Sequence, residues 1–377
     1  MTQKNTSGLF WAGMAAIAIG LIAGIWGVIS LLTQGHAAMG VNDQIPWGVL
    51  VPGYVFFVAA SAGCVIVALG YALGIKRFAL IMKRAIFLAI ITLLAGGALI
   101  LIELGSPLKA INFVLSPNPL SPMWWMLVFY TLYLAMLLVE FYLITTGRVS
   151  NLRTISVFTA FSAIAVHSTL GGIFGLAAVR TYFGGALSPV YFILIAMLIG
   201  TALLLLVTIL TYKLTKATMS AELHALVLDL GKFLGIVLGV GIFFTLWKII
   251  AGLRSTVDST VIAYQDTVGL WWYWVFVILI GLVIPIVLLL NPKTRNINVV
   301  ALASVCVLIG MFGARVEFTL GGEIVPVMKD LVHPGFSSHY APTFVEIAIL
   351  GLAFSGVALL YILGARKLEL DKVAEHD

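Results

Sequence analysis

The sequence predicts an all-α integral membrane protein that crosses the bilayer about ten times and forms a single membrane domain over residues 1–377. Of the 377 residues, 62% are hydrophobic and only 10% are charged, and the mean hydropathy is +1.14. A water-soluble domain could not bury so many apolar side chains behind so few charges. The apolar residues also fall into ten runs, each close to the roughly 20 residues that cross a bilayer as a helix.

The ten predicted spans follow one another along the chain, and most of the connections are short. They cover residues 9–32, 48–74, 84–104, 123–146, 153–179, 188–212, 230–252, 270–290, 298–318 and 343–364. The first run follows Lys4 and exceeds the about 7–15 residues of a signal-peptide core, so we expect it to stay as a span. Pro46 lies just before the second span and Pro52 lies in its first turns, where the missing N–H of proline costs a helix little stability.

Basic residues predict the direction of the ten spans. Of the 21 Lys and Arg residues, 15 lie in or beside the connections on one side, four lie in the connections on the other, and two, Lys248 and Arg315, lie within spans. Cytoplasmic loops of membrane proteins carry the excess of Lys and Arg. We therefore expect both termini to be cytoplasmic, in the inner membrane of a bacterium or archaeon.

The predicted outer face carries the longer loops. These cover residues 33–47, 105–122, 180–187, 253–269 and 319–342. Seven of the nine tryptophans also lie toward this side, as expected for an interfacial belt. Long polar loops with Gly and Pro suit either a docking surface or a plain solvent-exposed surface.

Small and polar residues interrupt the second span, in the sequence PWGVLVPGYVFFVAASAGC. Ser61 and Gly63 lie near mid-membrane, and Tyr54 lies nearer the outer edge. One interpretation is a gap that receives a flat, lipid-soluble ring, with Tyr54 at its mouth and Ser61 as a deeper hydrogen-bonding group. The other is close helix packing through small residues, which needs no ligand.

His167 is the single histidine that lies well inside a predicted span. Gly171 and Gly175 follow at i+4 and i+8, so the imidazole and two small residues share one helix face. His167 could bond a quinone carbonyl or relay its proton, or it could be a core histidine that donates to a backbone carbonyl. Because bis-histidine haem ligation needs a second well-placed histidine, the sequence disfavours a b-type cytochrome.

Intramembrane acids are functional candidates because charge is costly in lipid. Glu103 ends the third span and could take a quinol proton near the outer surface, or simply face interfacial water. Glu317 follows a stripe of small residues; Arg315 points about 160° away from it, so each needs a partner on another element. Glu140 lies toward the inner side and, with Glu317, is a candidate for a proton path. Glu346, at the mouth of the last helix, suits a structural role.

The two cysteines, Cys64 and Cys306, lie inside apolar runs and show no metal-binding spacing. We therefore expect no haem or metal in this chain, and any metal centre would belong to a partner.

Several segments together resemble the polysulfide-reductase membrane-subunit (NrfD-like) family in its ten-helix form, related to hydrogenase membrane anchors and to membrane subunits of respiratory molybdoenzymes. They are GVNDQIPWGVLVPGYVFFVAASAGC, LGYALGIKRFALIMKRAIFLAI, ELGSP, MWWMLVFYTLYLAMLLVEFY, HSTLGGIFGL, ARVEFTLGGEIVP and YAPTFVEIAI. The resemblance implies two four-helix bundles plus additional helices, and a menaquinone or ubiquinone held near the outer face. Carried over to this sequence, it favours Tyr54, Ser61, Glu103 and His167 as quinone and proton residues.

The same resemblance implies partners. A periplasmic four-cluster iron–sulfur subunit would exchange electrons with the quinone, and a catalytic subunit beyond it would be a molybdopterin enzyme, a hydrogenase or a multihaem cytochrome. Two other functions remain open: a proton-coupled secondary transporter, which ten helices with intramembrane acids also suit, and a passive anchor for a periplasmic enzyme.

Overall fold

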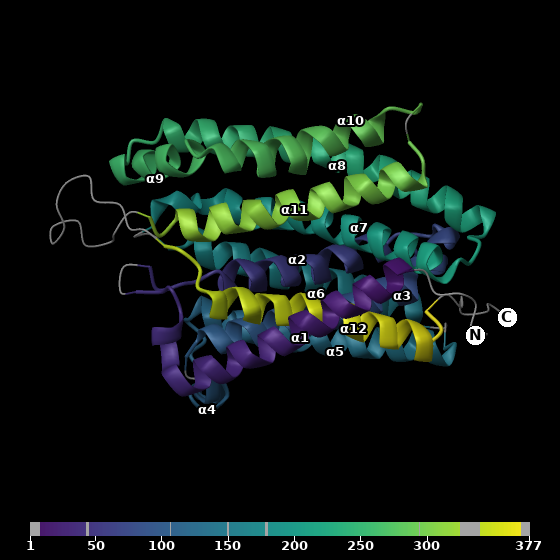
Figure 1. Ribbon diagram of the computed structural model, residues 1–377, viewed down its shortest axis with the longest axis horizontal. Coiled ribbons are helices and arrows are strands. Elements are labelled where there is room, and N and C mark those ends of the chain that lie inside the picture. Colours follow the sequence, from purple (N-terminus) through teal and green to yellow (C-terminus); the bar gives the residue numbers. More distant parts are fainter. Residues whose placement is uncertain are drawn as a thin grey trace.

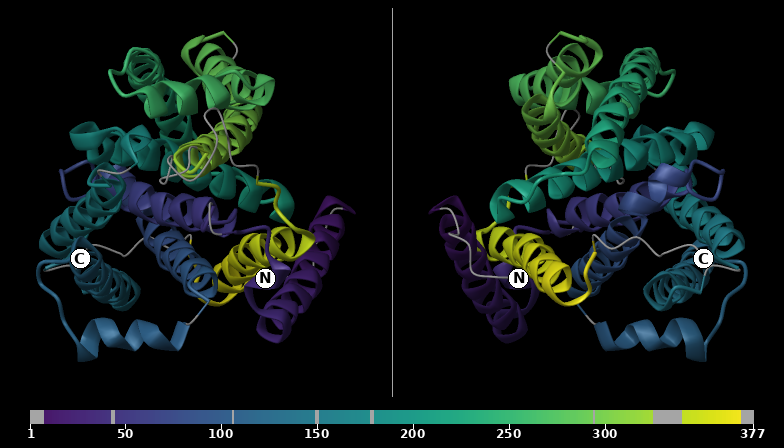
Figure 2. Two further views of the ribbon diagram at one scale, coloured as in Figure 1. Left: turned by 90° about the vertical axis from the view of Figure 1, so that its left-hand side faces the viewer. Right: turned by 90° about the vertical axis from the view of Figure 1, so that its right-hand side faces the viewer.

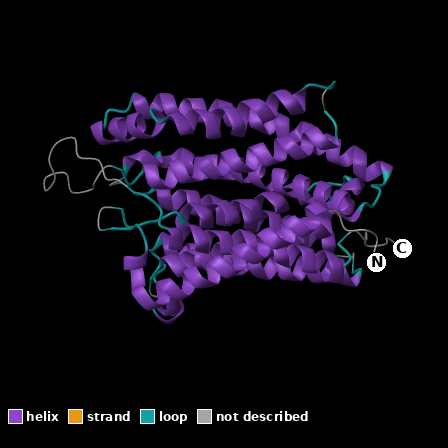
Figure 3. Cartoon of the chain, viewed as in Figure 1, coloured by secondary structure: helices purple, strands orange, loops and turns teal. Residues whose placement is uncertain are grey.

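The computed structural model describes residues 8–42, 45–105, 107–148, 151–177, 180–293, 295–324 and 340–370, and within these residues it contains helices but no β-strand (Figure 3). Ten helical stretches are long and apolar enough to cross a membrane, as predicted. The long helices are α1 Gly8–Gln34, α2 Leu50–Ala68, α3 Ala79–Glu103, α5 Pro122–Thr146, α6 Leu152–Gly175, α7 Ser188–Thr215, α8 Ala221–Leu253, α11 Ile297–Gly321 and α12 Phe344–Lys367. The remaining span joins the π-helix η6, Tyr273–Val283, to α10, Ile284–Leu290.

Helix α2 lies at the centre of the molecule, with α3 and α6 on one side and α7 and α11 on the other (Figures 1 and 2). Nearly all of its residues are buried, whereas α1, α5 and α12 leave wide apolar faces exposed. Because those faces would meet lipid, the membrane solvates the outer helices while α2 packs only against protein. The contacting helix pairs are compatible with the predicted division into two four-helix bundles, which stays a prediction.

Glycines bring the central helices into backbone contact. A Cβ atom on Gly63 would collide with the Ala196 carbonyl of α7, and one on Gly200 would collide with the Gly63 backbone. Gly281 of η6 and Gly310 of α11 meet in the same way. In a membrane, where hydrophobic driving force between helices is weak, such contacts provide the packing. Of the two interpretations of the second span, helix packing therefore accounts for Gly63.

The first and last helices pack on each other along the edge of the molecule (Figure 2). Gly20, Gly24 and Gly27 form a small-residue stripe on α1 that faces Ser355, Leu352 and Ile349 of α12. The stripe has i, i+4, i+7 spacing, so it presents one face of α1 to its partner. Since the chain crosses ten times, Gly8 and the end of α12 lie at the same end of the molecule, at the right in Figure 1.

Several predicted boundaries are wrong at the membrane surface. Helix α8 begins at Ala221, nine residues before the expected start at 230, because Ser220 caps it by accepting a hydrogen bond from the Leu223 N–H at 3.2 Å. The expected outer loop 253–269 contains the helix α9, Asp258–Val268, and the expected loop 105–122 contains η3, Pro107–Ile111, and α4, Asn112–Leu115. Hydropathy marks only the apolar length of a helix, so it does not detect these polar turns.

The eighth span departs from α-helical pitch over Tyr273–Val283. The wider turns end just before Pro285, whose ring cannot donate a hydrogen bond to the carbonyl of Gly281. Within the described residues the other spans are α-helical apart from short 3₁₀ segments at their ends. The interruption therefore has no matching partner in the other half of the chain, which a transporter with paired broken helices would show.

Candidate functional site

Three glutamates and a tyrosine gather around the start of α2, at the predicted outer end. Three consecutive backbone N–H groups point at them: that of Trp47 to Glu323 Oε2 at 3.3 Å, that of Gly48 to Glu103 Oε1 at 2.5 Å, and that of Val49 to the Tyr340 hydroxyl at 2.8 Å. These three residues directly precede Leu50, the first residue of α2. Their N–H groups bring together Glu103 at the end of α3, Glu323 just beyond α11 and Tyr340 before α12, and Glu346 of α12 joins them through Tyr340. We call these four residues the outer acid cluster.

Glu346 is the fully bonded member of the outer acid cluster. Its Oε1 accepts from the Tyr340 hydroxyl at 2.5 Å, and its Oε2 accepts from the N–H groups of Gly40 and Thr343, both at 2.8 Å. Together with the Thr343 hydroxyl it forms a capping box on α12. The predicted structural role of Glu346 agrees with this geometry. A Cβ atom on Gly48 would collide with the Glu346 carboxylate, so a larger residue there would have to displace that side chain.

Glu103 and Glu323 each keep one buried oxygen free. Glu103 Oε2 and Glu323 Oε1 have no hydrogen-bond partner among the described residues, and the two side chains are 7% and 0% exposed. Burial raises the pKa of Glu323, which lies beyond the end of α11, to about 8, although Arg180 and the Trp47 N–H oppose the rise. Such carboxyl groups can hold and release a proton near neutral pH.

Tyr54 and Ser61 both face α5. The Tyr54 hydroxyl lies 2.7 Å from that of Tyr130, and the Ser61 hydroxyl lies 2.9 Å from that of Tyr133. Ser61 also donates to the Ala89 carbonyl of α3 at 2.8 Å. These side chains thus find partners within the protein rather than lining an open gap.

Glu140 continues the same face of α5 toward the inner end. Its Oε1 accepts from the Ser156 hydroxyl of α6 at 2.7 Å, while Oε2 has no partner among the described residues. At 1.5 Å per residue, Glu140 lies about 10 Å from Tyr133 along α5, and Tyr54 lies about 9 Å from Gly48 along α2. We call the set Glu103, Tyr54–Tyr130, Ser61–Tyr133 and Glu140–Ser156 the polar series.

His167 lies apart from the polar series. Its Nε2 is 3.5 Å from Nη2 of Arg315, and its Nδ1 has no partner among the described residues. The face that carries Gly171 and Gly175 is closed by the start of α7, since a Cβ atom at Gly171 would meet Pro189, Ser188 and Phe192. The two glycines therefore serve helix packing.

Glu317 pairs with Lys248 of α8. Both carboxylate oxygens accept from the ammonium group, at 2.9 and 2.6 Å, and the Tyr182 hydroxyl also donates to Glu317. The rings of Tyr182 and Tyr191 lie 5.9 and 5.5 Å from the ammonium nitrogen. The predicted need for a counter-charge on another helix is met, and Arg315 indeed points elsewhere.

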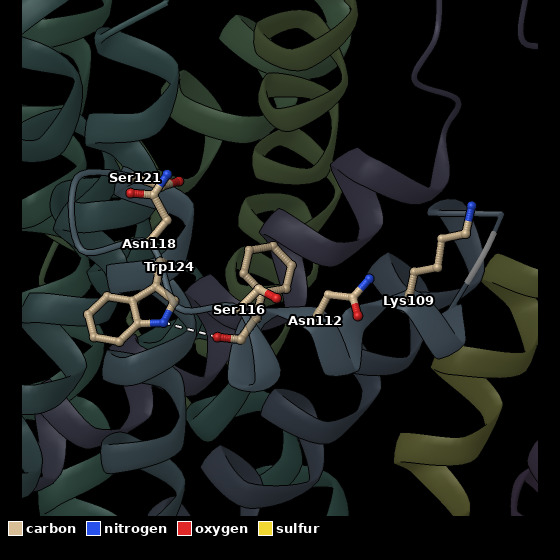
Figure 4. Close-up of a pocket in the computed structure, with 7 residues that line it drawn as sticks. Lys109, Asn112, Ser116, Asn118, Ser121 and Trp124 are labelled. Atoms are coloured by element: carbon tan, nitrogen blue, oxygen red, sulfur yellow. Dashed lines mark hydrogen bonds between the residues drawn. The ribbon is translucent and has the colours of Figure 1, made fainter.

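A surface cavity of about 250 Å³ lies at the predicted outer end, where η3 and α4 lead into α5. Figure 4 shows Lys109, Asn112 and Ser116 along this segment and the Trp124 indole, which donates to the Phe113 carbonyl at 3.0 Å. None of the sequence-predicted site residues lines this cavity.

Sequence reasoning missed several members of these groups. Tyr130 and Tyr133 were missed although they share a face of α5 with the predicted Glu140, at i, i+3 and i+10, and this spacing could have identified them. Glu323 and Tyr340 gave no such signal, because their partner is the backbone of α2 rather than a side chain. Among the described residues, no group of three or more His, Cys, Asp or Glu side chains is placed to hold a metal ion.

Comparison with known proteins gives the class of the chain. The family model "Polysulphide reductase, NrfD" matches residues 38–326, and the chain belongs to this family. The chain is thus a multi-pass membrane protein of a family of oxidoreductase membrane subunits.

Three curated relatives resemble it over most of their length. The Hdr-like menaquinol oxidoreductase integral membrane subunit of Archaeoglobus fulgidus is 26% identical, over 87% of this chain and 85% of the relative. A putative membrane subunit of dimethyl sulfoxide reductase from Halobacterium salinarum is 28% identical, over 99% and 94%. A selenate reductase subunit from Mesobacillus selenatarsenatis is 24% identical, over 85% and 86%.

Proposed function

We propose that this chain is the quinone-interacting membrane subunit of a respiratory oxidoreductase complex. It exchanges electrons between the membrane quinone pool and an iron–sulfur subunit docked on the outer, periplasmic face. Family membership and the menaquinol named for one relative support this proposal. The quinone is menaquinone or ubiquinone, and the chain carries no haem or metal of its own.

The observation that carries the proposal is the free carboxylate oxygen of Glu103 at the outer end of the polar series. Quinol oxidation breaks two O–H bonds and yields quinone, two protons and two electrons. Glu103 accepts the two protons one after the other and passes each to outer water, while the two electrons leave to the iron–sulfur partner. Quinone reduction runs the same transfers in reverse.

The other predicted residues divide between binding and proton transfer. Tyr54 and Ser61, with their tyrosine partners, support the ring side of the site, and His167 hydrogen-bonds a quinone oxygen. Glu140 extends the polar series toward the inner face, with water bridging the intervals of about 10 Å. Glu317, held by Lys248, is a second candidate for proton transfer.

The partners follow from the relatives. Two of them are named as subunits of dimethyl sulfoxide reductase and selenate reductase, so we propose a catalytic subunit beyond the iron–sulfur protein. A molybdopterin enzyme is the first choice, and a hydrogenase or multihaem cytochrome would use the same arrangement. The complex would lie in the cytoplasmic membrane.

The experiment is quinol-linked reduction of iron–sulfur clusters in the complex extracted with mild detergent, compared among wild type, Glu103→Gln and His167→Ala. Removing a positioned acid–base group costs on the order of 100-fold or more in rate, so we expect Glu103→Gln to slow reduction by about this factor in an intact complex. Glu222→Gln, an exposed glutamate at the inner end of α8, is the matched control and should change nothing.

Subunits identified by mass spectrometry complete the test. If no redox partner accompanies the chain, proton-coupled transport becomes the leading function. If cluster reduction in both variants equals that of wild type, the chain is a passive anchor or its quinone site lies elsewhere.

A further inference from the structure

Arg315 is a buried cation without an anionic partner among the described residues. It is 1% exposed, and its guanidinium group lies over the Phe192 ring at 4.3 Å. Its Nη2 makes two long contacts, each of 3.5 Å, to His167 Nε2 and to the Phe192 carbonyl. Its Nε and Nη1, and Nδ1 of the fully buried His167, have no hydrogen-bond partner among the described residues.

The neighbouring cation shows what a structural charge looks like in this protein. Lys248 donates to both carboxylate oxygens of Glu317. Glu317 lies on the same helix as Arg315, two residues further along and about 160° around the helix axis. Arg315 makes no salt bridge within the described residues. One protein therefore contains, at nearly the same depth, a neutralised cation and an unneutralised one.

An unneutralised guanidinium in this interior is costly. A buried charge that lacks a partner loses its hydration without recovering it, and unpaired N–H donors add their own desolvation cost. Intramembrane charges of this kind mark pathways and binding sites more often than structural contacts. Among the described residues, Arg315 Nε and Nη1 have no acceptor, and a ligand could supply one as a strongly polar neutral group or as a negative charge.

The tyrosine pairs of the polar series do not have this need. Tyr54 and Tyr130 satisfy each other, as do Ser61 and Tyr133. A quinone offers carbonyl oxygens, which are acceptors, and it reaches the protein interior through lipid. The hydrogen bonds of its oxygens are therefore most favourable where the protein has donors without acceptors.

We propose that Arg315, together with His167, binds one oxygen of the quinone ring. This inference rests on the proposed function and adds to it a residue and a position. The Phe192 ring holds the guanidinium plane from one side, and the free Nε and Nη1 donate to the quinone oxygen. Arg315 lies six residues before the end of α11, about 9 Å from the outer end, so the bound ring lies near the outer face.

The test is binding of a short-tailed naphthoquinone to the purified complex, measured by titration calorimetry without turnover. The variants are Arg315→Met, Arg315→Lys and His167→Gln. The matched control is Arg84→Met, which removes a fully buried arginine at the inner end of α3. A lost charged hydrogen bond weakens binding by roughly 10- to 100-fold, so we expect this change in Arg315→Met, a smaller one in Arg315→Lys and His167→Gln, and none in Arg84→Met.

A second readout separates binding from packing. Because Arg315→Met removes an unneutralised charge, the thermal midpoint of the quinone-free complex should stay equal or rise while quinone affinity falls. Wild-type affinity in Arg315→Met overturns the inference. If that variant does not assemble, wild-type affinity in both Arg315→Lys and His167→Gln overturns it.

These outcomes also separate the inference from the proposed function. A wild-type complex that binds no quinone contradicts the proposed function itself. A wild-type complex that binds quinone with an affinity independent of Arg315 leaves the proposed function intact and removes only the position.

Discussion

Several buried charged residues in this protein have polar atoms without a hydrogen-bond partner among the described residues. Glu103, Glu140 and Glu323 each present a buried carboxylate oxygen with no partner among the described residues, and Arg315 presents unpaired donors. Glu346, in contrast, is fully bonded and holds the start of α12. These side chains are buried to a similar extent, but they differ in how completely the described residues satisfy their hydrogen bonds.

Glu323 should make stability depend on pH. Its pKa is raised in the folded protein from an ordinary 4.5 to about 8, so between these values the folded state binds more protons than the unfolded state. The stabilisation is fully present below pH 4.5 and is lost as the pH rises through about 8. We expect the thermal unfolding midpoint of the wild-type protein in detergent to fall from about pH 4.5 to about pH 8 and to level off above that.

The matched comparison uses Glu323→Gln, which should flatten this fall because the amide does not titrate. Glu222→Gln, at an exposed position, should keep the wild-type slope. Equal slopes in wild type and Glu323→Gln would show that another group causes the dependence.

At the scale of elements, helices of this protein are joined by glycine contacts and by one buried ion pair among the described residues. The pair Lys248–Glu317 joins α8 to α11 beside the π-helical span, where glycine contact brings η6 against α11. The ion pair therefore adds a second attachment of α11 next to the π-helical span.

Removing one partner of this ion pair should lower the free energy of unfolding strongly, whereas replacing both partners should lower it little. Lys248→Met and Glu317→Gln should each destabilise by about 3–5 kcal/mol, because each leaves the partner buried alone, whereas the double variant should recover most of the loss. The exposed pair Arg77–Asp229, with side chains 46% and 51% exposed, is the control, and its loss should cost under about 1 kcal/mol. Unfolding in detergent measures all of these variants; additive losses in the double variant would contradict the coupling.

The distribution of basic residues predicts how the whole molecule is oriented in the membrane. With ten candidate spans, Gly8 and the end of α12 lie on one side, and the excess of basic connections predicts that this side is cytoplasmic. Alkaline phosphatase fused to either terminus should be inactive, and green fluorescent protein fused there should fluoresce. The opposite result at both termini would place the outer acid cluster in the cytoplasm and exclude a periplasmic partner.

The fold is predictable because apolar length is a local property of the sequence. All ten spans are found, and the errors lie in polar helical segments: the start of α8, where the Ser220 cap decides the boundary, and the short helix α9. The site is predictable only in part. Tyr54 and Ser61 stand out as polar residues in lipid, but their partners Tyr130 and Tyr133 lie 76 and 72 residues further along the chain. Which helices become neighbours is decided by packing, and no short motif records it.

The pairing of α1 with α12 has a consequence for biosynthesis. The first span to leave the ribosome finds its main packing partner in the last one, more than 300 residues later, so α1 waits in lipid until synthesis ends. Its glycine stripe faces acyl chains during that interval. A chain cut short before α12 would therefore lose two helices from the assembly rather than one, and quality-control proteases would meet α1 as an unattached segment.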